Sequence, residues 1–150
     1  MDYRDATEAD LPAIVHLLAD DRFGAGRERD MSPLPPSYLA GFRAMLVQGG
    51  RIMLAVQDGA VVGCMQFNVI HGVSQQGRSR AQVEGVRVDS TMRGRGIGVA
   101  MMRHAMVEAR AAGCAILQLT TNRERTEAQA FYARLGFIHS HAGMKIALEP

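Results

Sequence analysis

The spacing of apolar residues along the 150-residue chain changes between two periods. Apolar residues three and four positions apart predict helices over residues 8–20, 37–48, 98–112 and 124–136. Apolar or alternating runs predict strands over residues 3–6, 51–57, 60–70, 81–88 and 114–121, and two short strands within 137–149. The order β-α-α-β-β-β-α-β-α-β-β is typical of an α/β layer structure, here with about seven strands and four helices.

Short polar signals mark where several elements begin and end. Thr7 and Asp10 resemble a capping box in front of the first helix. The pair Asp58-Gly59 separates two apolar runs and predicts a tight hairpin turn. Residues 20–36 are polar, contain three prolines and form a long connection, which is typical of a functional loop.

Composition indicates an ordinary globular protein. The chain is 47% hydrophobic and 21% charged, and its length suits one domain over residues 1–150. No stretch is apolar enough to span a membrane, and the acidic, polar start is not a signal peptide. A cytoplasmic location is therefore expected.

The charge balance excludes some partners. There are 17 basic residues, all arginine except Lys145, and the net charge is only +2. This excess is too small to indicate nucleic-acid binding, and an aromatic content of 5% provides no stacking platform for RNA. The histidines and cysteines lack the spacing of a metal site, so no metal is expected.

The glycine-rich stretch MRGRGIG, residues 92–98, connects a predicted strand to a predicted helix. Glycine allows positive φ and close approach of the backbone, and the first N–H groups of a helix attract anions. The stretch therefore predicts an anion site, strengthened by Arg93 and Arg95. A P-loop requires Gly-Lys-Ser/Thr, and a dinucleotide fingerprint requires another glycine spacing and an acidic residue after the next strand. Neither is present.

Two motifs resemble those of the GNAT superfamily of N-acetyltransferases. Arg93, Gly96 and Gly98 match the acyl-CoA signature Arg/Gln-x-x-Gly-x-Gly/Ala. The stretch AQAFYARLGF, residues 128–137, is similar to the second motif of the superfamily. The order of elements also fits along nearly the whole chain. The resemblance implies the GNAT fold, with a mixed, mostly antiparallel sheet, and acetyl-CoA as cosubstrate.

The superfamily pattern also implies which residues bind acetyl-CoA. The strand carrying Val86, Arg87 and Val88 would bond the pantetheine arm through its backbone, at a gap where this strand and the next separate. The turn would hold the pyrophosphate through Arg93, Gly94, Arg95, Gly96, Ile97, Gly98 and Val99. Asn122 either bonds the pantetheine arm or serves as a turn residue. The spacing between Asn122 and Ala128 is longer than is common in the superfamily.

Acetyl transfer to an amine needs an unprotonated amine and a proton for the departing thiolate. Tyr132 is the candidate acid, because the superfamily places this tyrosine beside the sulfur; the alternative is a core residue on one helical face. Glu84 is the candidate base, because it stands among apolar residues, where burial would raise its pKa. The alternative for Glu84 is a structural partner of Arg80 or another arginine.

The sequence thus predicts an N-acetyltransferase acting on a small or amino-acid-like primary amine. Residues 20–36 and 71–80 are expected to line the acceptor site. Protein N-termini or lysines are alternative acceptors, and a non-catalytic acyl-CoA-binding regulatory module is an alternative of another class. Members of the superfamily often form dimers, so a homodimer is a further expectation.

Overall fold

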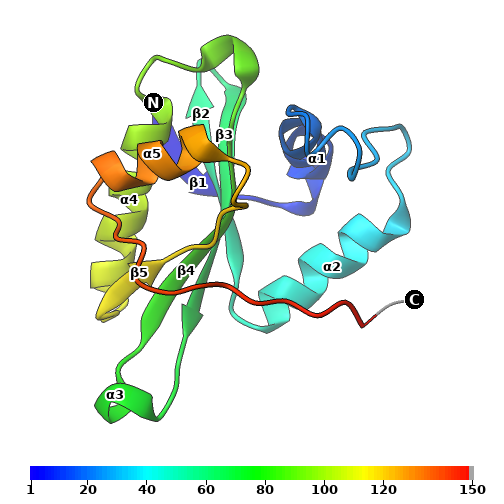
Figure 1. Ribbon diagram of the computed structural model, residues 1–150. Helices are drawn as coiled ribbons and strands as arrows, with labels where there is room; N and C mark the ends of the chain where they lie inside the picture. The colour runs from blue at the N-terminus through cyan, green and yellow to red at the C-terminus, as the bar shows by residue number, and fades with distance from the viewer. Residues whose placement is uncertain (149–150) are drawn as a thin grey trace. The chain divides into compact units, whose positions relative to one another are not determined.

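A computed structural model describes residues 1–148 and divides the chain into two compact units, residues 1–118 and the residues from 119 onward (Figure 1). The first unit contains one mixed sheet of five strands in the order β1-β2-β3-β4-β5. The strands are β1 (Asp2–Asp5), β2 (Arg51–Gln57), β3 (Ala60–Ile70), β4 (Arg80–Val88) and β5 (Ile116–Gln118). Neighbours from β1 to β4 are antiparallel, and β4 and β5 are parallel. The predicted mixed, mostly antiparallel sheet is confirmed.

Helices cover both faces of this sheet. The first unit contains η1 (Glu8–Asp10), α1 (Leu11–Ala19), α2 (Pro36–Val47), α3 (Ser74–Gly77), η2 (Ser90–Met92) and α4 (Ile97–Ala111). In Figure 1, α1 and α2 lie on one side of the sheet and α4 lies on the other. Within residues 1–148, no helix has both the length and the apolar character that crossing a bilayer requires.

The core consists of one apolar layer on each face of the sheet, because side chains alternate between the faces of a strand. The cluster beneath α1 comprises Ile14, Leu17, Leu54 and Cys64. On the other face, β3 approaches α4 so closely that a Cβ added to Gly63 would lie 2.6 Å from Met101 Sδ. In α1, Leu17 is buried in this cluster, and Leu18 packs against it while partly exposed.

A glycine bulge bends β4 in its middle. Gln66 pairs with Glu84 and Cys64 pairs with Arg87, so one residue of β3 faces two residues of β4. Within this bulge, Gly85 has φ +57. A residue at positive φ in a bulge bends the strand and changes the direction of the side chains next to it. The bulge therefore sets the position of the second half of β4.

We expect Gly85→Ala to lower the free energy of unfolding by about 1–2 kcal/mol, because L-residues other than glycine are strained at positive φ. Urea denaturation measures the change. Gly41→Ala is the matched control, because this position in α2 has open space around an added Cβ. Alanine there should stabilise the helix by about 0.5–1 kcal/mol. Equal effects of the two substitutions would contradict the strain at Gly85.

The second unit contains α5 (Thr126–Arg134) and an extended segment after it. The two closing strands predicted within residues 137–149 are wrong as far as residue 148, where no strand is assigned; residue 149 lies outside the described residues. The apolar alternation is present at Met144, Ile146 and Leu148, but all three side chains are exposed. Alternation favours extended backbone, whereas a strand also needs a paired neighbour. The prediction of seven strands is therefore corrected to five within residues 1–148.

Candidate active site

Strand β4 extends beyond the end of β5, its parallel neighbour in the sheet. Their parallel pairing ends at Gln82 and Gln118, while β4 continues to Val88. The N–H of Asp89 donates to the Val62 carbonyl on β3 at 3.0 Å. Because successive residues of a strand direct their N–H and C=O groups to opposite edges, the polar groups of Val88 face away from β3. In the second half of β4, Val86 and Val88 therefore form an edge to which an extended ligand can bond, whereas the N–H and C=O of Arg87 face β3.

The glycine-rich turn follows this edge directly and leads into α4. Gly94 and Gly96 have φ values of 76° and 81°, and Gly96 is the N-cap of α4. The first bond inside the helix is donated by Ala100 to the Gly96 carbonyl at 3.0 Å. The N–H groups of residues 97–99 therefore have no partner within the helix, at the end where its dipole is positive. This geometry fits a pyrophosphate.

The two arginines of the turn have different surroundings. The Arg93 guanidinium donates to the Val88 carbonyl at 3.1 Å and to the Asp20 carbonyl at 2.7 Å. Arg93 thus braces the turn against the end of α1. The side chain of Arg95 is exposed. Of the two cations, Arg95 is the one whose guanidinium is not engaged by another described residue.

Two consecutive aspartates fasten the end of α1 to β4 and the turn. The Asp20 carboxylate accepts a hydrogen bond from the Ser90 N–H at 2.7 Å. The Asp21 carboxylate lies 3.4 Å from Arg87 Nε, and both of these side chains are largely buried. Inside the turn, the hydroxyl and N–H of Thr91 donate to Asp89 and lower the pKa of that carboxyl. These contacts therefore connect the start of the loop that follows α1 to β4 and to the glycine-rich turn, residues 92–98, which is called the cofactor turn below.

Glu84 lies on the face of the sheet that carries α1 and α2. It pairs across the sheet with Gln66, whereas the neighbouring Val83 is buried on the opposite face. Glu84 is exposed, so the expected burial is wrong. The Gln82 side-chain amide donates to the Glu84 carboxylate. The Gln118 side-chain amide donates in turn to the side-chain oxygen of Gln82 at 2.7 Å. The side-chain amides of Gln118 and Gln82 thus hold the Glu84 carboxylate just beyond the last paired residues of β4 and β5.

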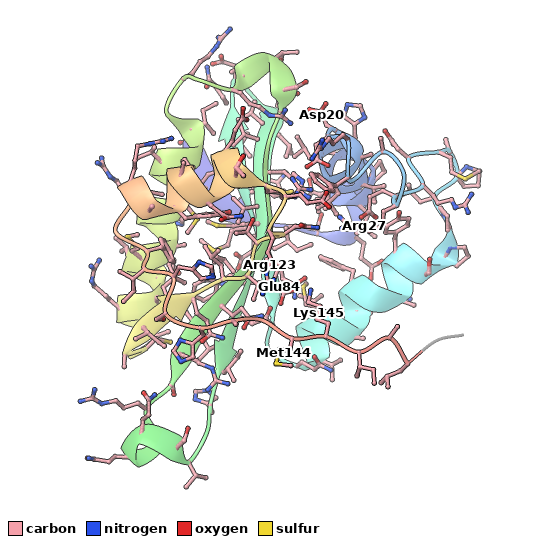
Figure 2. The ribbon with its side chains drawn as sticks, viewed as in Figure 1. Asp20, Arg27, Glu84, Arg123, Met144 and Lys145 are labelled. Atoms are coloured by element: carbon pink, nitrogen blue, oxygen red, sulfur yellow. The ribbon has the colours of Figure 1, made fainter. Side chains whose placement is uncertain are left out.

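A groove of about 280 Å³ lies on the same face, between α1, α2 and the sheet. Its walls are mostly apolar, with side chains such as Ile14, Leu18 and Phe42. Its polar lining includes Tyr38 and Gln66, the cross-strand partner of Glu84. The groove therefore extends to the cross-strand neighbour of Glu84, although Glu84 itself is not part of its lining. Figure 2 shows Glu84 on β4.

The second unit holds the other two predicted site residues. Tyr132 is partly buried on α5 and makes edge contacts with the rings of Phe131 and Phe137, at centroid distances of 5.1 and 5.7 Å. The Asn122 side-chain oxygen accepts a hydrogen bond from the Glu124 N–H at 2.9 Å, which is a turn interaction. The role of each residue toward acetyl-CoA stays a prediction.

Sequence reasoning missed several groups at this site. Asp20 and Asp21 were assigned to a loop without partners, since their contacts are with residues about seventy positions away. The amides of Gln82 and Gln118 were also missed. A signal for Gln82 is present, because polar residues alternate with apolar ones in RAQVEG, residues 80–85. One face of this strand is therefore polar where a helix-covered sheet would be apolar.

Comparison with known proteins agrees with this geometry. The sequence profile of the Acetyltransferase (GNAT) family matches residues 11–137, which span both units. An aminoalkylphosphonate N-acetyltransferase of Salmonella typhimurium is 35% identical over 110 residues, which are 70% of this chain and 68% of the relative. Glucosamine 6-phosphate N-acetyltransferase 1 of Oryza sativa subsp. japonica is 29% identical over 136 residues, or 85% of this chain and 81% of the relative.

A solved structure resembles the chain along its whole length. The crystal structure described as a transcriptional regulator from Bacillus halodurans is 40% identical with a TM-score of 0.93, and the alignment covers 98% of this chain and 99% of that one. The family match and the two acetyltransferase relatives indicate the same activity. The strand edge that leads into the glycine-rich turn fits the cosubstrate of that activity. The chain therefore belongs to the GNAT family and is an acetyl-CoA-dependent N-acetyltransferase.

Proposed function

We propose that this enzyme transfers the acetyl group of acetyl-CoA to the primary amine of a small molecule. The observation that carries the proposal is the continuous path from the free edge of β4 to the N-terminus of α4. Such a path matches a long ligand with amide groups at one end and a pyrophosphate at the other. The acceptor then enters from the groove on the α1 and α2 face.

In this proposal, each part of the path binds one part of acetyl-CoA. The backbone of Val86 and Val88, on either side of Arg87, bonds the amides of the pantetheine arm. The N–H groups from Arg95 to Val99 hold the pyrophosphate, and the Arg95 guanidinium adds charge at the surface. Arg93 keeps the turn in its binding conformation through Asp20, and Asn122 contributes through its amide nitrogen.

The chemistry consists of one bond formed and one bond broken. Acetyl-CoA supplies an acetyl thioester, which is activated toward an amine. Glu84, directly or through a water molecule, takes the proton from the ammonium so that the neutral amine can attack the carbonyl carbon. The new C–N bond forms as the C–S bond breaks, and Tyr132 gives its proton to the departing thiolate. The attached nitrogen then loses its second proton, through water, to the Tyr132 phenolate, which restores the tyrosine. Backbone N–H groups of β4 stabilise the developing oxyanion.

We further propose that the acceptor carries an anionic group besides its amine. The names of the two relatives describe amines that bear a phosphonate or a phosphate. A groove with mostly apolar walls offers such a molecule few polar contacts along its length. The anionic group must therefore be recognised at one end of the groove, by a cation.

One observation favours a second candidate function, a regulatory protein that binds acetyl-CoA without turnover. The B. halodurans chain that resembles this one is described as a transcriptional regulator. A regulator needs the cofactor path but does not need a carboxylate held beside the acceptor groove. The orientation of Glu84 by Gln82 therefore favours the enzyme.

A panel of amines, read by release of free CoA thiol, tests the proposal. We expect turnover with 2-aminoethylphosphonate or glucosamine 6-phosphate, and weaker turnover with peptides. Gly98→Asp is the control, because it places a carboxylate at the helix end that should bind pyrophosphate; this variant should lose both binding and turnover. Acetyl-CoA binding by calorimetry without turnover of any amine would support the regulatory protein instead.

A further inference from the structure

We infer that Arg27 is the residue that binds the anionic group of the acceptor. The inference rests on the proposed function and deepens it by assigning a residue to the acceptor. Arg27 lies in the segment between α1 and α2, on the side of the sheet that carries the groove, as Figure 2 shows. Its side chain is 60% exposed, so a ligand can reach the guanidinium.

A network of neighbouring side chains fixes the direction of this guanidinium. Arg27 Nε donates to Glu28 Oε1 at 2.7 Å. The other oxygen of Glu28 accepts a hydrogen bond from the Tyr38 hydroxyl at 3.0 Å, and that hydroxyl accepts from the Arg29 N–H at 2.8 Å. The Glu28 side chain is only 14% exposed. Both carboxylate oxygens of Glu28 thus accept hydrogen bonds. Glu28 therefore orients Arg27, and Tyr38 in turn orients Glu28.

The network leaves the two Nη groups of Arg27 available to a ligand. Only Nε is used in the bond to Glu28, and the described residues supply no other partner. Two parallel N–H groups form a planar fork that matches two oxygens of a phosphonate, phosphate or carboxylate. Because the fork is already oriented, binding an oxyanion costs less side-chain freedom than ordering a mobile arginine.

Tyr38 connects this cation to the acceptor groove. One end of Tyr38, the hydroxyl, supports Glu28, while the residue also lines the groove. The same groove is lined by Gln66, which pairs with Glu84 on β4. The groove thus contains Gln66, the cross-strand neighbour of the proposed base Glu84, and Tyr38, which supports the network that ends in the Arg27 guanidinium. Glu84 and Arg27 themselves lie outside its lining. A molecule with an amine at one end and an oxyanion at the other satisfies both.

Two other arginines of the first unit, Arg43 and Arg93, are less suited to this role. Arg43 donates through two nitrogens to Glu8, at 2.7 and 2.9 Å, so that carboxylate already occupies its fork. The guanidinium of Arg93 is used by the cofactor turn. Arg43 therefore provides a matched control, since its replacement also removes one positive charge and one ion pair with a glutamate.

The test compares Arg27→Gln and Arg43→Gln with two acceptors, 2-aminoethylphosphonate and propylamine. We expect Arg27→Gln to raise KM for the phosphonate by roughly 10- to 100-fold, the range for losing a charged hydrogen bond. KM for propylamine and the Kd of acetyl-CoA should stay within about twofold, and Arg43→Gln should change none of these values. Arg27→Lys should restore part of the phosphonate KM, because it keeps the charge but not the fork.

Two outcomes separate the possible failures. An unchanged phosphonate KM in Arg27→Gln, or an equal loss with both acceptors, would overturn the role of Arg27 and leave the proposed function standing. A wild-type protein that turns over neither amine would overturn the proposed function itself. Melting temperatures of all variants show whether a loss comes from unfolding, and Glu28→Gln, which keeps the bond from Tyr38, should give a smaller loss than Arg27→Gln.

Discussion

Tyr132→Phe should lower turnover by roughly 10²–10⁴-fold, the usual contribution of one acid–base group. The ring of Tyr132 makes edge contacts with Phe131 and Phe137, and phenylalanine keeps both contacts. Only the hydroxyl is lost, so the melting temperature should change little. The Kd of acetyl-CoA should barely change, because proton donation strengthens only in the transition state. Steady-state kinetics, calorimetry and thermal melting measure the three quantities.

Tyr3→Phe is the matched control for this experiment. Tyr3 stacks on His104 with a centroid distance of 4.1 Å in the first unit, away from the cofactor turn and the groove. Removing its hydroxyl should leave turnover unchanged. If Tyr132→Phe instead loses stability and keeps near-normal turnover, Tyr132 is a core residue and solvent protonates the thiolate.

Glu84→Gln should also lower turnover by roughly 10²–10⁴-fold near neutral pH, with the deficit shrinking as the pH rises. An alkyl amine is mostly protonated at neutral pH, since its pKa is near ~10.4. The base is needed only while the amine carries this proton. At a pH close to the pKa of the amine, solvent supplies the neutral nucleophile and the variant should approach the original enzyme. A pH–rate profile from about pH 6 to 10 measures this convergence.

Glutamine preserves the size of the Glu84 side chain, and because this position is exposed, the melting temperature should not change. Glu127→Gln is the control, because Glu127 is an exposed carboxylate on the first turn of α5. A profile for Glu84→Gln that runs parallel to the original at every pH would assign Glu84 a structural role. The convergence thus separates proton transfer from support of the fold.

Local sequence signals predicted most of the fold of the first unit. The hairpin around Asp58 and Gly59 and the start of α4 at the glycine turn agree with the structure within a residue or two. These features depend on periodicity, turn residues and caps, which act over a few positions. The two closing strands predicted after residue 136 are absent as far as residue 148. A strand also needs a neighbouring strand to pair with, and periodicity does not specify that neighbour.

The site was predictable where it depends on backbone, and less so where it depends on side-chain partners. The cradle around Gly96 follows from glycine at a strand-to-helix junction. The exposure of Glu84 and the bond from Arg93 to Asp20 do not follow from neighbouring residues. Both result from the tertiary arrangement, in which the bulge at Gly85 and the end of α1 bring distant segments together. The network around Arg27 joins residues at most ten positions apart, but they lie in an irregular segment whose side-chain bonds follow from no periodicity.

In the proposed function, the uncovered edge of β4 also makes the lifetime of the folded protein depend on the concentration of acetyl-CoA. An uncovered strand edge is a template for pairing with another chain and so for aggregation. In the proposed function, the ligand that covers this edge of β4 is the cosubstrate, so its binding would both block this template and stabilise the folded state. The stabilisation reaches about 2.7 kcal/mol when the ligand is present at a hundred times its Kd. When acetyl-CoA is scarce, the enzyme loses this protection together with its substrate.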